Sequence, residues 1–147
     1  ILTHLGAWAP MAEQKAVAQL LGNRSAIKDY LTHFRKEVEE RLQRIYDGFT
    51  SLKKEGLPVD AIAPEAAIYL TIKIDLAGKK TAGGKLLENQ SDVTDYILNE
   101  AKLAVVPFYA FGASRNSDWY RLSVGTCKKE EINEMIEMLG KALRKAQ

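Results

Sequence analysis

Apolar side chains recur every three or four residues from Ser25 to Leu52 and predict one face of a long amphipathic helix. Gly56 followed by Pro58 is typical of a helix end. At 1.5 Å per residue this helix is roughly 45 Å long, more than the width of a domain of this size. Such a helix usually connects domains or lies along a larger partner. The apolar positions are Ile27, Tyr30, Leu31, Phe34, Val38, Leu42, Ile45, Tyr46, Phe49 and Leu52.

The rest of the chain contains segments with the pattern of strands and segments with the pattern of helices. Alternating apolar and polar residues predict strands at 66–76 and 119–124, with a short strand at 105–106. Pro10 and Gly22-Asn23 are typical of the start and end of a helix at 10–21, and Ser91 is typical of the N-cap of a helix that runs to Lys102. Helical spacing of apolar residues predicts a final helix at 128–145, with Thr126 as its N-cap. This order predicts an α+β fold of two layers, in which helices cover one face of a small, mainly antiparallel sheet.

Composition narrows the classes of function. The 147 residues suffice for one ordinary domain, and 21 basic against 19 acidic side chains leave a net charge of only +2. That balance argues against nucleic acid as a partner. No apolar run approaches the roughly 20 residues of a membrane span, and the single cysteine, Cys127, suits a reducing, cytoplasmic compartment. Because the chain begins at Ile1 rather than at methionine, we expect a piece of a longer protein.

Several familiar sites are absent from the sequence. The segment from Gly78 to Lys85 resembles a phosphate-binding loop, but its glycine spacing is wrong and Leu86 replaces the expected serine or threonine. A flexible surface loop is the favoured interpretation. His4 and His33 are isolated, so no metal site is expected. No nucleophile motif or carboxylate pair stands out either, and we assign no catalytic residue to this chain.

Arg121 is the strongest candidate for binding chemistry. It lies in the strand at 119–124, where Tyr120, Leu122 and Val124 face one side and Trp119, Arg121 and Ser123 the other. Most arginines in strands face solvent or form structural ion pairs. A guanidinium fixed beside aromatic side chains is nevertheless well suited to bind a carboxylate through two parallel hydrogen bonds.

Three stretches, in the right order, resemble the C-terminal portion of class I and II (fold type I) pyridoxal-phosphate-dependent aminotransferases, the aspartate-aminotransferase-like superfamily. The first runs from Thr3 to Ala16. The second is Glu65-Ala66-Ala67-Ile68-Tyr69-Leu70. The third comprises Ala101 to Pro107, then Phe111-Gly112, then Tyr120-Arg121-Leu122-Ser123 and the closing helix.

The resemblance implies a role for each part of the chain. Arg121 matches the family's arginine for the substrate carboxylate, and Gly6, Ala7 and Trp8 form a loop near the active site or subunit interface. Residues 1–24 are then a remnant of the large domain, 25–55 the interdomain helix and 56–147 the small C-terminal domain. The intact enzyme would be a homodimer that transfers an amino group between an amino acid and a 2-oxo acid, with pyridoxal phosphate as electron sink.

The chain also departs from the family pattern. Phe108 replaces the usual glycine after Val-Val-Pro, and Ala67 stands where a glycine is common. The large domain is missing, and with it the lysine that binds the cofactor, so the isolated chain is expected to be inactive and to bind no pyridoxal phosphate. An alternative interpretation is a non-catalytic α+β interaction module whose long helix docks a protein partner.

Overall fold

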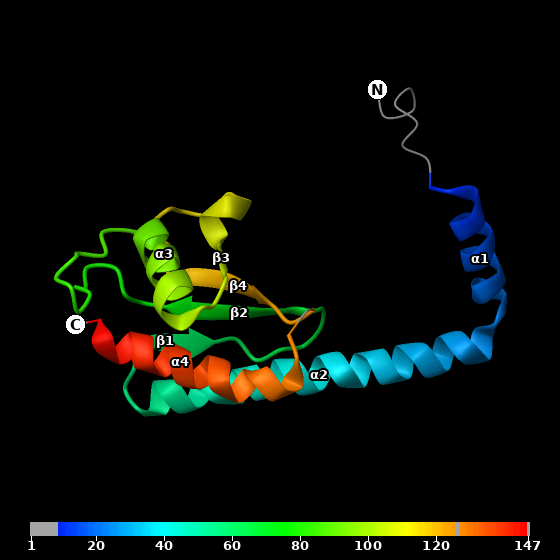
Figure 1. Ribbon diagram of the computed structural model, residues 1–147, viewed down its shortest axis with the longest axis horizontal. Coiled ribbons are helices and arrows are strands. Elements are labelled where there is room, and N and C mark those ends of the chain that lie inside the picture. Colours follow the sequence, from blue (N-terminus) through cyan, green and yellow to red (C-terminus); the bar gives the residue numbers. More distant parts are fainter. Residues whose placement is uncertain (1–8, 126, 147) are drawn as a thin grey trace, which may run out of the picture. The chain divides into compact units, whose positions relative to one another are not determined.

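The computed structural model describes residues 9–125 and 127–146 and divides into two compact units, 1–37 and 38–147. The first contains α1 (Met11–Gly22) and the start of α2 (Arg24–Lys54). The second contains the rest of α2 and a sheet with two further helices (Figure 1). Its elements are β1 (Val59–Ala61), β2 (Tyr69–Ile74), α3 (Gln90–Ala101), β3 (Val106–Pro107), the 3₁₀-helix η1 (Phe108–Phe111), β4 (Trp119–Ser123), the 3₁₀-helix η2 (Lys129–Glu131) and α4 (Ile132–Lys145).

The sheet has the strand order β1-β2-β4-β3, and every neighbouring pair is antiparallel. Burial alternates along β2 and β4, so that one face of the sheet belongs to the core and the other stays accessible. The core face is completed by side chains of α2, α3 and α4. This two-layer arrangement confirms the predicted α+β fold. The buried residues of the two central strands are Leu70, Ile72, Ile74, Tyr120 and Leu122.

Two glycines allow α2 and α4 to approach closely. A Cβ atom at Gly48 would lie 2.6 Å from the Cγ1 and Cδ1 atoms of Ile136, and one at Gly140 would lie 3.0 Å from Leu52. Each glycine therefore accepts a side chain of the opposite helix. This packing buries the C-terminal part of the predicted apolar face of α2.

That apolar face is buried along only part of its length. Leu42, Ile45, Phe49 and Leu52 are buried, whereas Tyr30 is 64% exposed. Helix α1 has no buried residue among those described. The exposed part of this apolar face belongs to the first unit. Its exposed large apolar side chains are Met11, Val17, Leu20, Leu21, Tyr30, Leu31 and Phe34.

Some sequence-based details were wrong. The N-cap of α3 is Asn89, whose side chain accepts hydrogen bonds from the backbone N–H groups of Ser91 and Asp92, so Ser91 is not the cap. Strand β1 was not predicted, β2 is shorter than expected, and the short strand is 106–107 rather than 105–106. The expected cap Thr126 lies outside the described residues, and α4 begins four residues later than predicted, at Ile132. The domain boundaries after 24 and 55 stay a prediction.

The segment after β2 forms a hydrogen-bonded hairpin. The N–H of Gly78 donates to the carbonyl of Leu87, and the N–H of Leu87 donates to the carbonyl of Lys79. At the tip, the N–H of Thr81 donates to the carbonyl of Lys85. Lys85 also forms an ion pair with Asp92 at 3.4 Å. This geometry differs from a phosphate-binding loop, in agreement with the sequence analysis.

Candidate functional site

Arg121 lies in the middle of β4, with a strand on each side. It is in register with Thr71 of β2 and with Val106 of β3. Its neighbours Tyr120 and Leu122 are buried, so alternation directs the partly exposed Arg121 to the accessible face of the sheet. The predicted alternation, with Tyr120 and Leu122 on one side of the strand and Arg121 on the other, is confirmed.

Two aromatic rings contact the guanidinium of Arg121. Its Cζ atom is 4.4 Å from the centroid of the Tyr69 ring and 4.3 Å from that of Phe111. Tyr69 belongs to β2 and Phe111 to the connection between β3 and β4, so the rings come from opposite sides of β4. Both distances are well within the range of a favourable cation–π contact.

Local backbone geometry determines where Phe111 lies. The 3₁₀-helix η1 begins directly after Pro107 of β3, and Phe111 is its last residue. Gly112 follows at φ 88°, and its N–H donates to the carbonyls of Phe108 and Tyr109. Phe108 packs edge-on against Phe111, with ring centroids 6.4 Å apart. The Phe111-Gly112 pair thus ends η1 with its aromatic ring beside Arg121.

The charges around the site leave the guanidinium without a carboxylate. Among residues 9–125 and 127–146, no Asp or Glu lies within ion-pair distance of Arg121. On the same face of β2, Lys73 forms ion pairs with Asp75 at 3.2 Å and with Asp118 at 3.9 Å. Burial, followed by the charge of Asp75, raises the pKa of Asp118. The nearby acidic groups are therefore engaged with Lys73, and the N–H groups of Arg121 can take an external acceptor.

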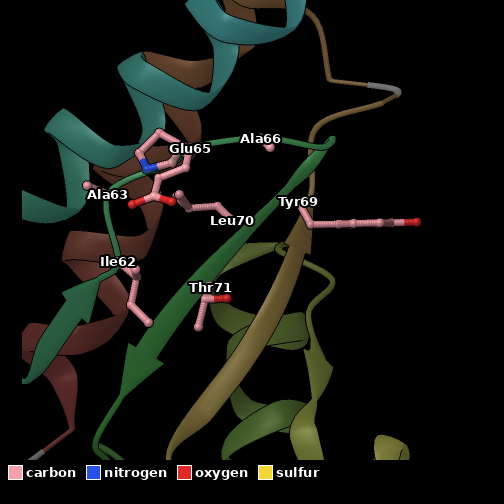
Figure 2. A pocket seen from close by; sticks show the side chains of 8 residues that line it. Ile62, Ala63, Glu65, Ala66, Tyr69, Leu70 and Thr71 are labelled. Atoms are coloured by element: carbon pink, nitrogen blue, oxygen red, sulfur yellow. The ribbon is translucent and has the colours of Figure 1, made fainter.

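A small cleft lies near the start of β2. It has a volume of about 240 Å³ and is lined by the turn from Ile62 to Ala66 and by β2 residues 69–71. In Figure 2 the Tyr69 ring extends away from the other lining side chains, and this ring is the one that contacts Arg121. The cleft lining contains no lysine or arginine. It lacks both an amine for covalent attachment and a cation for a phosphate, and does not fit pyridoxal phosphate.

The other sequence-based candidates gain no further support. Gly6, Ala7, Trp8 and His4 lie outside the described residues. His33 is exposed on α2. Within the described part of the chain no group of three or more His, Cys, Asp or Glu side chains could hold a metal ion. No helix there is both long and apolar enough to cross a membrane.

Cys127 packs against the core, and its partial burial raises the pKa of the thiol. A raised pKa disfavours the thiolate, so Cys127 has the character of a packed side chain rather than of a nucleophile.

The two aromatic partners of Arg121 could not be identified from the sequence pattern. Alternation placed Trp119 on the same strand face as Arg121, whereas the observed ring partners are Tyr69 and Phe111. The contact with Tyr69 depends on the register between β2 and β4, in which Thr71 lies opposite Arg121. Only a correct strand pairing could have revealed it. The position of Phe111 depends on η1, which has no clear signal in the sequence.

The model of the family "Aminotransferase class I and II" matches residues 5–139. The chain belongs to this family. A probable aspartate/prephenate aminotransferase of Rickettsia felis is 34% identical over 84% of this chain, and an aspartate aminotransferase of Rhizobium meliloti is 29% identical over 80%. The crystal structure of the aspartate aminotransferase from Rhizobium meliloti superimposes with a TM-score of 0.69 at 28% identity over 81% of the chain.

These matches cover only part of the relatives. The chain spans 28% of the length of the Rickettsia felis protein, 27% of the Rhizobium meliloti protein and 28% of the matched crystal-structure chain. The resemblance inferred from the three sequence stretches is thereby confirmed at the level of the family.

Proposed function

We propose that this chain is the C-terminal part of a pyridoxal-phosphate-dependent aminotransferase, and that Arg121 binds the α-carboxylate of the substrate. The intact enzyme transfers an amino group between an amino acid and a 2-oxo acid. The observation that carries the proposal is the guanidinium on the accessible face of β4, bracketed by two rings and without an ion-pair partner among the described residues. Membership of the family supports the same assignment.

The geometry of a guanidinium suits this role. Its five N–H donors lie in one plane and match the two oxygens of a carboxylate. Rings stacked on the group do not compete for those donors. Arg121 would hold the substrate in one orientation and neutralise its charge, and closure of this domain over the substrate would exclude water from the reaction.

The remaining machinery belongs to the missing large domain. When bound there, pyridoxal phosphate supplies an electron sink for the bond-breaking chemistry. No lysine of this chain matches the family's cofactor-binding motif, and the cleft near β2 is unsuited to the group. We therefore assign no catalytic residue to this chain and expect it alone to be inactive and to form no covalent adduct with pyridoxal phosphate.

The exposed apolar side chains of α1 and of the start of α2 support a larger intact protein. We assign their cover to the large domain, with α2 as the helix that connects the two domains. By resemblance to the family, Gly6, Ala7 and Trp8 belong to a loop near the active site or the subunit interface of a cytoplasmic homodimer. The alternative of an interaction module would also explain the exposed apolar residues, but it gives no reason for the family match or for the bracketed arginine.

The decisive experiment replaces Arg121 in the intact enzyme. Arg121→Lys keeps the positive charge but loses the two-pronged hydrogen bonding, so KM for amino acids should rise about 10- to 100-fold, corresponding to roughly 1.5–3 kcal/mol for a charged hydrogen bond. Arg115→Lys is the matched control, because Arg115 is an exposed arginine whose recorded ring contact is with Tyr109. Equal kinetics of the Arg121→Lys and wild-type enzymes would reject the role assigned to Arg121.

A further inference from the structure

Tyr69 and Phe111 are two large aromatic residues that lie outside the hydrophobic core and share one contact, the guanidinium of Arg121. Their side chains belong to residues that are 40% and 54% exposed, and neither is part of the core cluster. Both rings nevertheless lie within 4.5 Å of the same guanidinium carbon, at 4.4 and 4.3 Å. Core packing therefore does not account for their position, whereas contact with Arg121 does.

The backbone next to each ring is also specialised. Ala67, two residues before Tyr69, has φ 64°, and Gly112, directly after Phe111, has φ 88°. Left-handed backbone is unfavourable for residues with a Cβ atom, so the turn before β2 maintains it at Ala67 against a conformational cost. Each ring thus lies within two residues of a left-handed backbone position.

We propose that Tyr69 and Phe111 are positioning residues that hold the Arg121 guanidinium in one orientation, so that it receives a planar monocarboxylate. The proposal rests on the proposed function of Arg121 and extends it to the residues that prepare the site. An arginine side chain in solvent samples many rotamers. Aromatic rings from the two neighbouring segments limit this motion without neutralising the charge, because a cation–π contact leaves the in-plane N–H groups available.

The same geometry predicts the class of anion. A guanidinium bracketed by rings presents its donors in one plane, which suits the two coplanar oxygens of a carboxylate. A guanidinium can also bind two oxygens of a phosphate, but a phosphate dianion gains more than a carboxylate from a second cation beside the first. Lys73, on the adjacent strand, is engaged with Asp75 and Asp118. The site should therefore prefer acetate over inorganic phosphate.

The first experiment measures the mobility of Arg121 without any ligand. In the ¹⁵N-labelled 147-residue chain, the Nε–Hε signal of Arg121 is assigned by its loss in Arg121→Lys, and its order parameter is determined from relaxation. We expect a restricted group in the wild type, and a fall to below about 0.6, the flexible range, in Tyr69→Leu and Phe111→Leu. Tyr69→Phe should retain the wild-type value because it keeps the ring. Unchanged order parameters in both leucine variants would overturn the proposal.

The second experiment separates this proposal from the proposed function. Sodium acetate is titrated against the same chains, with sodium chloride and sodium phosphate as controls, and shifts of the Arg121 signal are followed. Loss of one ring should weaken acetate binding about two- to fivefold, the equivalent of a cation–π contact at an exposed site. Tyr69→Phe should bind like the wild type. Because both rings are partly exposed, thermal midpoints should change little, which distinguishes positioning from a general loss of structure.

The acetate titration tests the carboxylate role of Arg121 and the positioning role of the two rings separately. If the wild-type chain shows no acetate-dependent shift, or if backbone signals near β4 still respond to acetate in Arg121→Gln, Arg121 is not the carboxylate site and the proposed function fails. If acetate binding depends on Arg121 but is equal in the wild type and in both leucine variants, the carboxylate role stands and the positioning role of the rings is refuted.

Discussion

At the scale of single residues, Ala67 is the clearest departure from favourable local geometry. Its φ of 64° belongs to the left-handed region, which costs a residue with a Cβ atom roughly 1–2 kcal/mol. The resemblance to the family implied a glycine at the same position. The structure supplies the physical reason, because the turn before β2 requires a backbone conformation that glycine adopts freely.

Ala67→Gly should therefore stabilise the chain. After allowance for the greater freedom of glycine in the unfolded state, we expect the free energy of unfolding to rise by about 0.5–1 kcal/mol. Denaturant unfolding followed by circular dichroism measures the change. Ala66→Gly is the matched control, since Ala66 is also exposed but has no left-handed backbone, and it should destabilise slightly. A loss of stability in Ala67→Gly equal to that in Ala66→Gly would contradict the explanation.

Tyr120 should make the fold sensitive to alkaline pH. Its phenol is buried, which raises its pKa above the ordinary value of 10.0, although side-chain contacts with Thr94 and Gln90 partly oppose the shift. Above pH 10 the unfolded chain releases this proton while the folded chain keeps it, so the folded state binds more protons. The free energy of unfolding must then fall as pH rises, by up to about 1.4 kcal/mol per pH unit for this group.

Comparison of the wild type with Tyr120→Phe isolates this effect. The free energy of unfolding, measured with urea at pH 7 to 11, should have the same pH dependence in both chains up to about pH 10. Above that pH it should fall faster in the wild type. Burial also raises the pKa of Tyr96, but that group is present in both chains and cancels in the difference. If the free energy of unfolding of the two chains has the same pH dependence, the pKa of Tyr120 is not raised in the folded state.

At the scale of elements, the start of α3 tests how helix ends are determined. The sequence suggested Ser91 as N-cap, but Asn89 has the extended backbone of a cap, and its side chain accepts two backbone hydrogen bonds, at 2.9 and 3.2 Å. Asn89→Ala should cost about 1 kcal/mol of stability, whereas Ser91→Ala should cost little. Thermal or urea unfolding of the two variants decides between the positions, and the reverse ranking would support Ser91.

The close approach of α2 and α4 depends on the absence of a side chain at Gly48. Although alanine favours helices over glycine by up to about 1 kcal/mol, Gly48→Ala would push a Cβ atom against Ile136 at 2.6 Å. Overpacking of this kind typically costs about 1–3 kcal/mol, so we expect a net loss of stability.

The control for steric origin is the double variant Gly48→Ala with Ile136→Ala, which should show a favourable coupling between the two sites. Gly22→Ala controls for the substitution itself, because nothing lies within 4 Å of its added Cβ atom, and it should not destabilise. If Ile136→Ala fails to relieve the effect of Gly48→Ala, the clash is not the cause.

The sequence predicted elements best where local signals were strong. Periodicity or helix-end residues predicted each α-helix of the described residues, and alternation predicted the two sides of β2 and β4, since that information lies within each segment. Strand β1 was missed because it has only three residues, and it is defined by pairing Val59–Ala61 with Ile72–Ile74. Pairing is a property of two distant segments. The same reason explains why the face of Arg121 could be predicted but its contact with Tyr69 could not.

At the scale of the whole molecule, the apolar face of α2 is buried along one part of the helix and exposed along the other. Its apolar stripe was predicted as one continuous face, yet the part in the second unit is buried and the part in the first is exposed. Periodicity reveals that a face is apolar but not what covers it. The chain spans 28% of the length of a matched relative, and the proposed function assigns the cover of this face to the large domain.

This exposed apolar surface leads to a prediction about the isolated chain. Water is a poor environment for clustered apolar side chains, and exposed patches promote association. Sedimentation velocity should therefore reveal concentration-dependent self-association of the wild type, which Leu21→Gln with Phe34→Gln reduces. Leu98→Gln is the matched control, because Leu98 is 48% exposed but lies on α3 in the second unit. Self-association that responds to Leu98→Gln but not to the first-unit variant, or a wild type that stays monomeric at all concentrations, would mean that the apolar side chains of α1 and α2 tolerate water without a covering partner.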